Sequence, residues 1–483
     1  MRRIHHIFFS ALIAAVLLLA ACGKKGPEPT LPVLPGGEPV TSRAAGETTA
    51  ALTISPDDPT AAQTTEPTEP PTAASTPSPA TQPTTPEETT PEPTEEPSTE
   101  GPDESSAEES TSPEETEPAT EPASTEPPAT QSPEEIALRE RAAAYLAQMD
   151  TRARLFQLII VTPEGISWDN PVKLPDNNEL RSCPVGGILY QAKNMETPDQ
   201  LTALVEGHQK VSSVPLLICV DEEGGRVSRI MQTMGTTPIK NMFTYRGDGI
   251  EKARTNALTL ATDISRFGFN LDFAPVADVW SNPENKVIGE RAYSDDFGKA
   301  ATLIASAVRG FHDGGVICTL KHFPGHGDTV EDSHENTAVV TKTLSELREQ
   351  EFLPFLSGIA AGADLVMTGH LMVPDVDPDN PATFSRKIVT DLLRKELGFD
   401  GVIITDALEM AAAASVSTGG EACLKALNAG CDMLLCPEGQ PEKLGQCVDF
   451  LAAALESGQL SGARVDESVL RVLMLKLKYG ILE

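Results

Sequence analysis

The sequence predicts an α/β fold, a (β/α)8 TIM-like barrel formed by the carboxyl-terminal part of the chain. Eight short apolar runs follow one another, most of them end in polar or turn residues, and segments with helical spacing lie between most neighbours. Alternation of strand and helix is typical of a parallel sheet covered by helices. The apolar runs are residues 156–161, 186–190, 215–220, 270–276, 316–320, 364–370, 401–405 and 431–436. The helical segments include residues 199–211, 252–266, 299–313, 345–361 and 421–428.

An open doubly wound sheet would show the same alternation, so the polar residues at the strand ends decide between the two folds. An open sheet gathers its ligand groups near one switch point, whereas a barrel brings all eight strand ends around one mouth. Reactive side chains follow many of the runs here, which favours the barrel. They are residues 221–223, Asp272, Asp278, residues 321–334, His370 and Asp406.

The amino terminus predicts export. Arg2 and Arg3 precede an apolar stretch at residues 7–19, which is too short for a membrane span and is typical of a secretory signal. The ending Leu-Ala-Ala-Cys at residues 19–22 resembles a bacterial lipobox, so we expect a signal peptide at 1–21 and a lipidated Cys22. This would hold the mature chain at the outer face of the cell membrane. The alternative is an ordinary cleaved signal.

Residues 22–133 predict a disordered, acidic linker rich in Pro, Thr, Glu and Ser. Such a segment has too little apolar surface to offset its ordering entropy. Residues 23–132 hold about 22 acidic and 3 basic side chains, more than half of the net charge of -34. This acidity argues against nucleic acid as a partner. Residues 134–483 are enough for one large domain, which we expect to be a monomer.

The cysteines predict neither a disulfide framework nor a metal site. Seven remain once Cys22 is set aside, an odd number, and no Cys-x-x-Cys pair occurs. We interpret them as ordinary thiols, several of them buried. They are Cys183, Cys219, Cys318, Cys423, Cys431, Cys436 and Cys447.

The segment KHFPGHGDTVEDSH, residues 321–334, carries the densest chemistry of the chain. Its side chains suit either glycoside cleavage, which needs a carboxylate and a proton donor, or hydrolysis at a metal held by His and Asp ligands. Pro324 and Gly325 interrupt the spacing of His322 and His326, so no helix aligns that pair as ligands. We therefore expect no metal and no cofactor. A purely structural loop is the third interpretation.

KHFPGHGDT followed by DSH resembles the hallmark of glycoside hydrolase family 3, in its β-N-acetylglucosaminidase branch. Further segments resemble the family in the same order, among them DEEGGRVSR, NLDFAPVADV, VIGERAYSDD, MTGHLMVP and GVIITDALEM. The resemblance covers about residues 140–483 and excludes the tail. It implies that 134–483 is the catalytic barrel.

The resemblance implies a retaining mechanism with a covalent glycosyl-enzyme. The nucleophile falls on Asp406, and the acid/base falls on His334 paired with Asp332. An imidazole can give a proton to the leaving oxygen and then take one from water, because its ordinary pKa lies near neutrality. Contacts to the sugar fall on Asp221, Arg229, Arg291, Lys321 and His322.

The chain departs from the family pattern at residues 335–337 and at Ala407, which bears on substrate preference. His326 and Asp328 are expected to shape the loop, with Gly325 and Gly327 supplying its torsions. Since few residues follow the last matching segment, we expect the acid/base to come from within the barrel.

The predicted activity is removal of terminal N-acetylglucosamine from peptidoglycan fragments or related glycans. The alternatives are a phosphorylase or another β-glycosidase of the family, and a surface glycan-binding lipoprotein without turnover.

Overall fold

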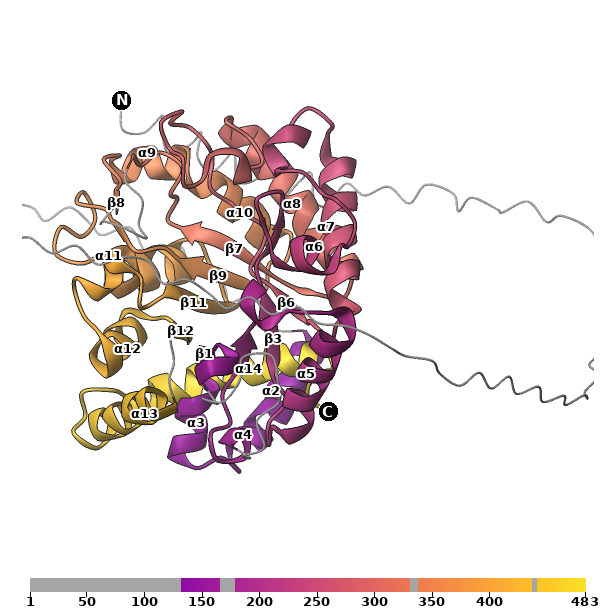
Figure 1. Ribbon diagram of the computed structural model, residues 1–483. Helices are drawn as coiled ribbons and strands as arrows, with labels where there is room; N and C mark the ends of the chain where they lie inside the picture. The colour runs from indigo at the N-terminus through magenta and orange to yellow at the C-terminus, as the bar shows by residue number, and fades with distance from the viewer. Residues whose placement is uncertain (1–131, 166–178, 331–337, 437–440) are drawn as a thin grey trace, which may run out of the picture. The chain divides into compact units, whose positions relative to one another are not determined.

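The computed structural model describes residues 132–165, 179–330, 338–436 and 441–483. Eight parallel strands close into a barrel in the order β1-β12-β11-β9-β7-β6-β3-β2 (Figure 1). They are β1 (Ile159–Val161), β2 (Gly187–Leu189), β3 (Leu217–Val220), β6 (Leu271–Asp272), β7 (Ile317–Phe323), β9 (Leu365–Thr368), β11 (Val402–Ala407) and β12 (Met433–Cys436). Each strand overlaps one of the apolar runs, and the predicted barrel is confirmed.

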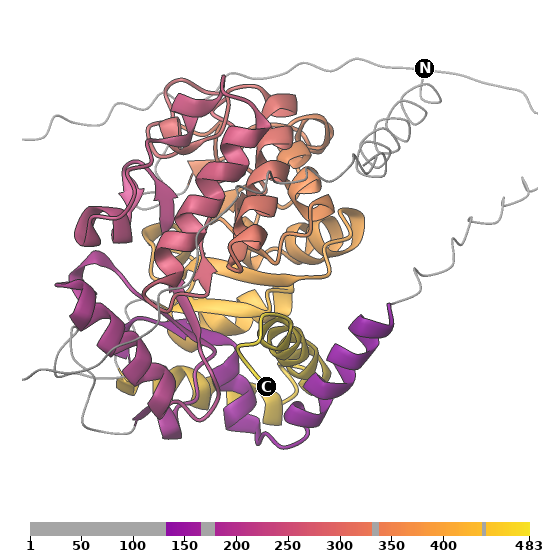
Figure 2. The same ribbon diagram turned by 90° about the vertical axis from the view of Figure 1, so that its right-hand side faces the viewer.

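Helices surround the strands, as the two views of Figures 1 and 2 show. They are α2 (Pro133–Leu146), α3 (Thr151–Gln157), α4 (Glu179–Ser182), α5 (Pro198–Val211), α6 (Arg229–Met234), α7 (Ile250–Ser265), α8 (Phe297–Asp313), α9 (Leu344–Glu349), α10 (Phe352–Ala360), α11 (Ala411–Ala414), α12 (Gly419–Ala429), α13 (Pro441–Glu456), α14 (Gly462–Lys478) and the π-helix η6 (Lys387–Glu396). Two small sheets pair β4 (Glu222–Gly224) with β5 (Val227–Ser228) and β8 (Ala338–Val339) with β10 (Leu371–Met372). Among the described residues, no helix combines the length and apolarity needed to span a bilayer.

Polar side chains fix where several helices begin. The Ser132 hydroxyl accepts the Glu135 backbone N–H at the start of α2, and the Glu135 carboxylate accepts the Ser132 N–H in return. The Asp296 carboxylate accepts the Lys299 N–H at the start of α8 at 2.7 Å. These bonds satisfy backbone donors that have no partner within the helix.

The barrel interior is filled by every second strand residue. Inward side chains form one apolar cluster, and the residues between them face the helices. The inward set includes Ile160, Leu217, Cys219, Leu271, Phe273, Ile317, Leu365, Met367, Val402, Ile404, Met433 and Leu435. Val472 and Leu475 of α14 join this cluster, so α14 packs against the barrel interior.

Several element boundaries differ from the sequence prediction, and two of the differences have an identifiable cause. The segment predicted as one helix at 345–361 is two helices, α9 and α10. Pro354 explains the break, because proline has no N–H and its ring clashes with the carbonyl four residues earlier, at Gln350. Strand β7 continues to Phe323 rather than ending at residue 320. The Lys321 carbonyl accepts the Ala277 N–H at 2.7 Å, which extends the pairing.

Candidate active site

The polar side chains predicted at the strand ends lie at one end of the barrel. Lys321 and His322 lie near the carboxyl end of strand β7, and Asp406 is the penultimate residue of β11. Asp221 follows β3 directly, and His370 comes two residues after β9. Because the strands are parallel, their carboxyl ends meet at the same mouth.

Lys321 is the centre of a buried network of ion pairs. Its ammonium Nζ lies 2.7 Å from Asp221 Oδ1 and 2.7 Å from Glu223 Oε1. Arg291 holds Glu223 from the other side through two hydrogen bonds, Nε to Oε2 at 2.7 Å and Nη2 to Oε1 at 2.8 Å. Two cations and two carboxylates therefore balance within the cluster.

Burial and charge set the ionisation of this cluster. Burial alone would raise the pKa of Glu223, but Arg291 and Lys321 outweigh it and hold that pKa well below its usual range. Burial would lower the pKa of Lys321, but Asp221 and Glu223 outweigh it and raise it. Glu223, Arg291 and Lys321 are therefore charged at neutral pH. The Asp221 side chain is 25% exposed and faces solvent more than its partners do, so it is the member that a ligand reaches.

His322 is oriented by the fully buried Asp278. The imidazole Nδ1–H donates to Asp278 Oδ2 at 2.7 Å, and the His322 backbone N–H points at the same carboxylate. The His326 backbone N–H donates to Asp278 Oδ1 at 2.7 Å. Asp278 stays ionised, because His322 and His326 outweigh burial and lower its pKa. This fixes the ring so that Nε2 is the nitrogen available for a ligand.

Asp406 is an ionised carboxylate beside two histidines. Burial would raise its pKa, but His322, His370 and the Ala407 N–H at 2.8 Å outweigh burial and lower it. His370 Nε2–H donates to the Ala407 carbonyl at 2.8 Å and so supports the end of β11. A charged, oriented carboxylate at this position is suited to nucleophilic attack.

Two further carboxyl groups hold the loop that carries Asp221 and Glu223. Asp272 accepts the Glu222 N–H at 2.9 Å, and the Glu222 carboxylate accepts the N–H groups of Ile230 and Met231 at 2.7 and 3.2 Å. Burial raises the pKa of Asp272 well above its usual range and that of Glu222 to about 7. Burial thus favours the protonated form of Asp272, which limits the negative charge beneath the site.

The structure brings most of the predicted residues together. Asp221, Arg291, Lys321, His322 and Asp406 belong to the linked contacts above. Arg229 begins α6, and its backbone N–H points at the Asp221 carbonyl at 3.4 Å. Asp332, His334 and Cys22 lie outside the described residues.

Glu223 and Asp278 have positions in the site that the sequence did not assign. Both lie among the polar strand ends, but residue spacing gives no sign that Glu223 pairs with Arg291, 68 positions away. The expectation for Gly327 was wrong in its reason. Gly325 has a positive φ of 127°, whereas Gly327 is required because a Cβ there would lie 1.7 Å from the Val279 carbonyl oxygen.

Comparisons with known proteins show a family resemblance along most of the barrel. The sequence model described as the glycosyl hydrolase family 3 N-terminal domain matches residues 151–475. The β-hexosaminidase of Stenotrophomonas maltophilia strain K279a is 40% identical over 261 residues, which cover 53% of this chain and 77% of that protein. The β-hexosaminidase A of Pseudoalteromonas piscicida is 35% identical over 330 residues, covering 63% of this chain and 55% of that protein.

A solved family 3 β-N-acetylglucosaminidase from Paenibacillus sp. strain FPU-7 has a similar structure. The TM-score is 0.65 at 38% sequence identity, and the match covers 69% of this chain. The match spans 63% of the Paenibacillus protein, less than two thirds of its length.

Proposed function

The chain belongs to glycosyl hydrolase family 3 and is a glycoside hydrolase, and on that basis we propose that it is a retaining exo-β-N-acetylglucosaminidase. Its substrate would be terminal β-linked N-acetylglucosamine on peptidoglycan fragments or related glycans. The ionised Asp406 at the barrel mouth, next to the Lys321 and Asp221 pair, is the observation that carries the proposal. Hydrolysis of β-N-acetylglucosaminides is supported by the names of the relatives.

In the proposed reaction, the Asp406 carboxylate attacks the anomeric carbon and forms a glycosyl-enzyme, which water then hydrolyses. The pKa of Asp406 is lowered by His322 and His370, which outweigh burial, so the nucleophile is ionised over the whole neutral range. Asp221 and Lys321 would accept and donate hydrogen bonds to the hydroxyls of the terminal sugar. Arg291 would either donate a hydrogen bond to the sugar directly or position Glu223 through its two hydrogen bonds to that carboxylate.

His334 with Asp332 would protonate the leaving oxygen and then activate water. The described site contains a second carboxylate–histidine pair, His322 with Asp278. The test of the acid/base must therefore separate His334 from His322.

Substrates with a good and a poor leaving group make this separation. We expect His334→Gly to reduce hydrolysis of the poor leaving group far more than that of an activated aryl glycoside, because only the former needs protonation. His322→Ala should reduce both rates to a similar extent, since it removes a contact to the sugar. The reverse pattern would assign the acid/base to His322.

The substrate is tested with muropeptides and chitooligosaccharides. We expect release of N-acetylglucosamine with retention of the β configuration, observed by NMR, and loss of at least about 10³-fold in turnover in Asp406→Asn. Adding phosphate should leave the product unchanged. A sugar phosphate as product would identify a phosphorylase, and binding without turnover would identify a glycan-binding lipoprotein.

We also propose that the enzyme is exported and anchored through a lipidated Cys22 at the outer face of the membrane. The basic residues, short apolar stretch and Leu-Ala-Ala-Cys ending of the amino terminus support this. An acidic linker between anchor and barrel is compatible with a cell-wall substrate. We expect no cofactor and a monomer.

A further inference from the structure

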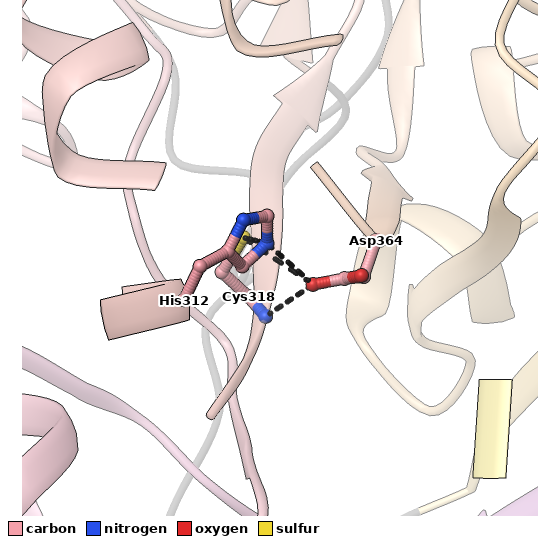
Figure 3. Close-up of side chains that lie close together, drawn as sticks. All are labelled: His312, Cys318 and Asp364. Atoms are coloured by element: carbon pink, nitrogen blue, oxygen red, sulfur yellow. Dashed lines mark hydrogen bonds and ion pairs between the residues drawn. The ribbon is translucent and has the colours of Figure 1, made fainter. Parts of the chain in front are cut away.

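His312, Cys318 and Asp364 converge at the opposite end of the barrel from Asp406. His312 lies in the last turn of α8, Cys318 is the second residue of β7, and Asp364 directly precedes β9 (Figure 3). Their side chains come from three separate segments, and one ligand atom from each lies within 4.8 Å of the other two. Imidazole, thiol and carboxylate are the three side-chain types that bind zinc.

The distances between these atoms suit a tetrahedral cation. His312 Nε2 lies 3.0 Å from Asp364 Oδ2, and Cys318 Sγ lies 3.8 Å from both of these atoms. Zinc bonds of about 2.3 Å to sulfur and about 2.0 Å to nitrogen or oxygen place tetrahedral ligand atoms roughly 3.3–3.5 Å apart. The distance between nitrogen and oxygen would have to lengthen, and the two distances to sulfur would have to shorten, by a few tenths of an ångström each to hold one ion.

Asp432, in the equivalent position of a neighbouring strand, is a carboxylate neutralised by arginines. It directly precedes β12 and accepts the Ile403 backbone N–H, as Asp364 precedes β9 and faces the Cys318 N–H. Three arginines surround Asp432, and no thiol or imidazole contacts it among the described residues. They are Arg394, Arg464 and Arg471. Asp364 instead pairs with one lysine, Lys478, and its other neighbours include the Cys318 thiol and the His312 imidazole.

The remaining contacts of Asp364 are compatible with a bound ion. Lys478 Nζ binds the other carboxylate oxygen, Oδ1, at 2.7 Å, and the Tyr479 hydroxyl donates to Oδ2 at 2.6 Å. These are outer contacts of the kind that orient a metal-binding carboxylate. Lys478 is 50% exposed and can also move aside.

An acidic cavity lies beside this position. A cavity of about 510 Å³ includes Asp364 and Lys478 in its lining, together with Glu134, Glu135, Asp400 and Glu467. Its carboxylates outnumber its cations, which favours entry of a positive ion. The His312 side chain is 27% exposed, so solvent reaches the cluster at this residue.

From this geometry we propose that His312 Nε2, Cys318 Sγ and Asp364 Oδ2 bind a thiophilic divalent cation, with Zn²⁺ as the preferred ion. The Cys318 thiol loses its proton to solvent on binding, and water completes the coordination. The ion ties the end of α8 to β7 and to the segment before β9. It lies away from the sugar site, so it is a structural ion. This proposal revises, at Cys318, the expectation that no cysteine of the chain binds a metal.

The test uses the full chain with a phosphine reductant and two probes, Zn²⁺ and Co²⁺. We expect one equivalent of Zn²⁺ per chain, measured by competition with a chromophoric chelator, and a thiolate-to-cobalt charge-transfer band with Co²⁺. Cys318→Ala should abolish the band and weaken Zn²⁺ binding at least about tenfold. His312→Gln, at a side chain that is 27% exposed, should weaken Zn²⁺ binding while the circular dichroism spectrum stays that of the wild type.

Two control variants locate the ion. Cys423→Ala removes a buried thiol that contacts the Cys436 and Cys447 thiols, and Asp406→Asn changes the catalytic face. Both should keep the band and the stoichiometry. Absence of Zn²⁺ binding in the wild type, a band lost in Cys423→Ala, or binding that persists in both Cys318→Ala and His312→Gln would overturn the proposal.

Discussion

Glu223 joins the two cations of the barrel mouth, Lys321 and Arg291, and its side chain is only 3% exposed. A carboxylate in this position lets the site present charged groups to a sugar without leaving a buried charge unpaired. Asp221 is the more exposed partner of Lys321, and its side chain is 25% exposed. The neutral balance of the cluster is what keeps it stable inside the protein.

Glu223→Gln should therefore damage both stability and catalysis. The change keeps the shape but leaves Arg291 without its carboxylate, and breaking a buried pair typically costs about 3–5 kcal/mol. We expect a loss of roughly 3 kcal/mol in the free energy of urea unfolding and at least about a hundredfold fall in kcat/KM.

Glu396→Gln is the matched control for this prediction. Glu396 also forms a two-bonded pair with an arginine, Arg348, but both side chains are about a third exposed. An exposed pair contributes about 0–1 kcal/mol. Equal destabilisation by the two variants would contradict the role given to Glu223.

The residue types of the site could be predicted from the sequence, but their partners could not. Asp406, Lys321 and His322 each stand at the end of an apolar run, and parallel strands oblige such ends to meet. The choice of Glu223 as the partner of Arg291, or of Asp278 as that of His322, depends on loop geometry between segments distant in the chain. No local pattern encodes that geometry.

At the scale of elements, alternation of apolar runs and helices was sufficient to place all eight strands. The errors lay at boundaries, where tertiary contacts decide. Strand β7 is longer than its apolar run because the Ala277 N–H bonds the Lys321 carbonyl. The break between α9 and α10, by contrast, has a local cause in Pro354 that the sequence already contained.

Helix α14 contains a fully buried lysine, Lys476, whose Nζ donates to Gln157 Oε1 at 2.9 Å. Burial lowers its pKa from 10.5 to about 7. At a pH between these two values, Lys476 is protonated in the unfolded chain and neutral in the folded chain. The free energy of unfolding therefore rises with pH across this window. Below about pH 7 the folded protein carries the full cost of a buried ammonium. The slope from this group is about 1.4 kcal/mol per pH unit.

Lys476→Met should remove this slope. Urea unfolding at pH 7 and pH 9 gives the free energy of unfolding of both proteins. We expect the difference, variant minus wild type, to be roughly 2 kcal/mol larger at pH 7 than at pH 9. Loss of the bond to Gln157 costs the variant a similar amount at both pH values, so it does not affect the difference. Lys395→Met, at a 62% exposed lysine, is the control. A variant that keeps the wild-type slope would contradict the assignment.

At the scale of the whole molecule, the proposed organisation is an anchor, an acidic linker and the barrel. The barrel contains every described residue of the site, so hydrolysis of a small soluble substrate should not depend on the other two parts. Access to an insoluble cell wall is different, because the reach of a flexible linker grows with its length. Activity on a soluble substrate therefore measures catalysis alone, whereas activity on an insoluble cell wall also depends on how far the barrel reaches from the membrane.

Shortening the linker should affect only the insoluble substrate. We expect deletion of residues 45–120 to leave kcat/KM on a soluble chromogenic N-acetylglucosaminide within about twofold of the full chain, while release of sugar from intact cells falls several-fold. Cys22→Ser should move the protein from the membrane fraction to the soluble fraction, again with unchanged kcat/KM on the soluble substrate. A scrambled linker of equal length and composition controls for sequence-specific contacts. If the shortened protein acts on intact cells as fast as the full chain, reach is not the function of the linker, because the proposal rests on linker length alone.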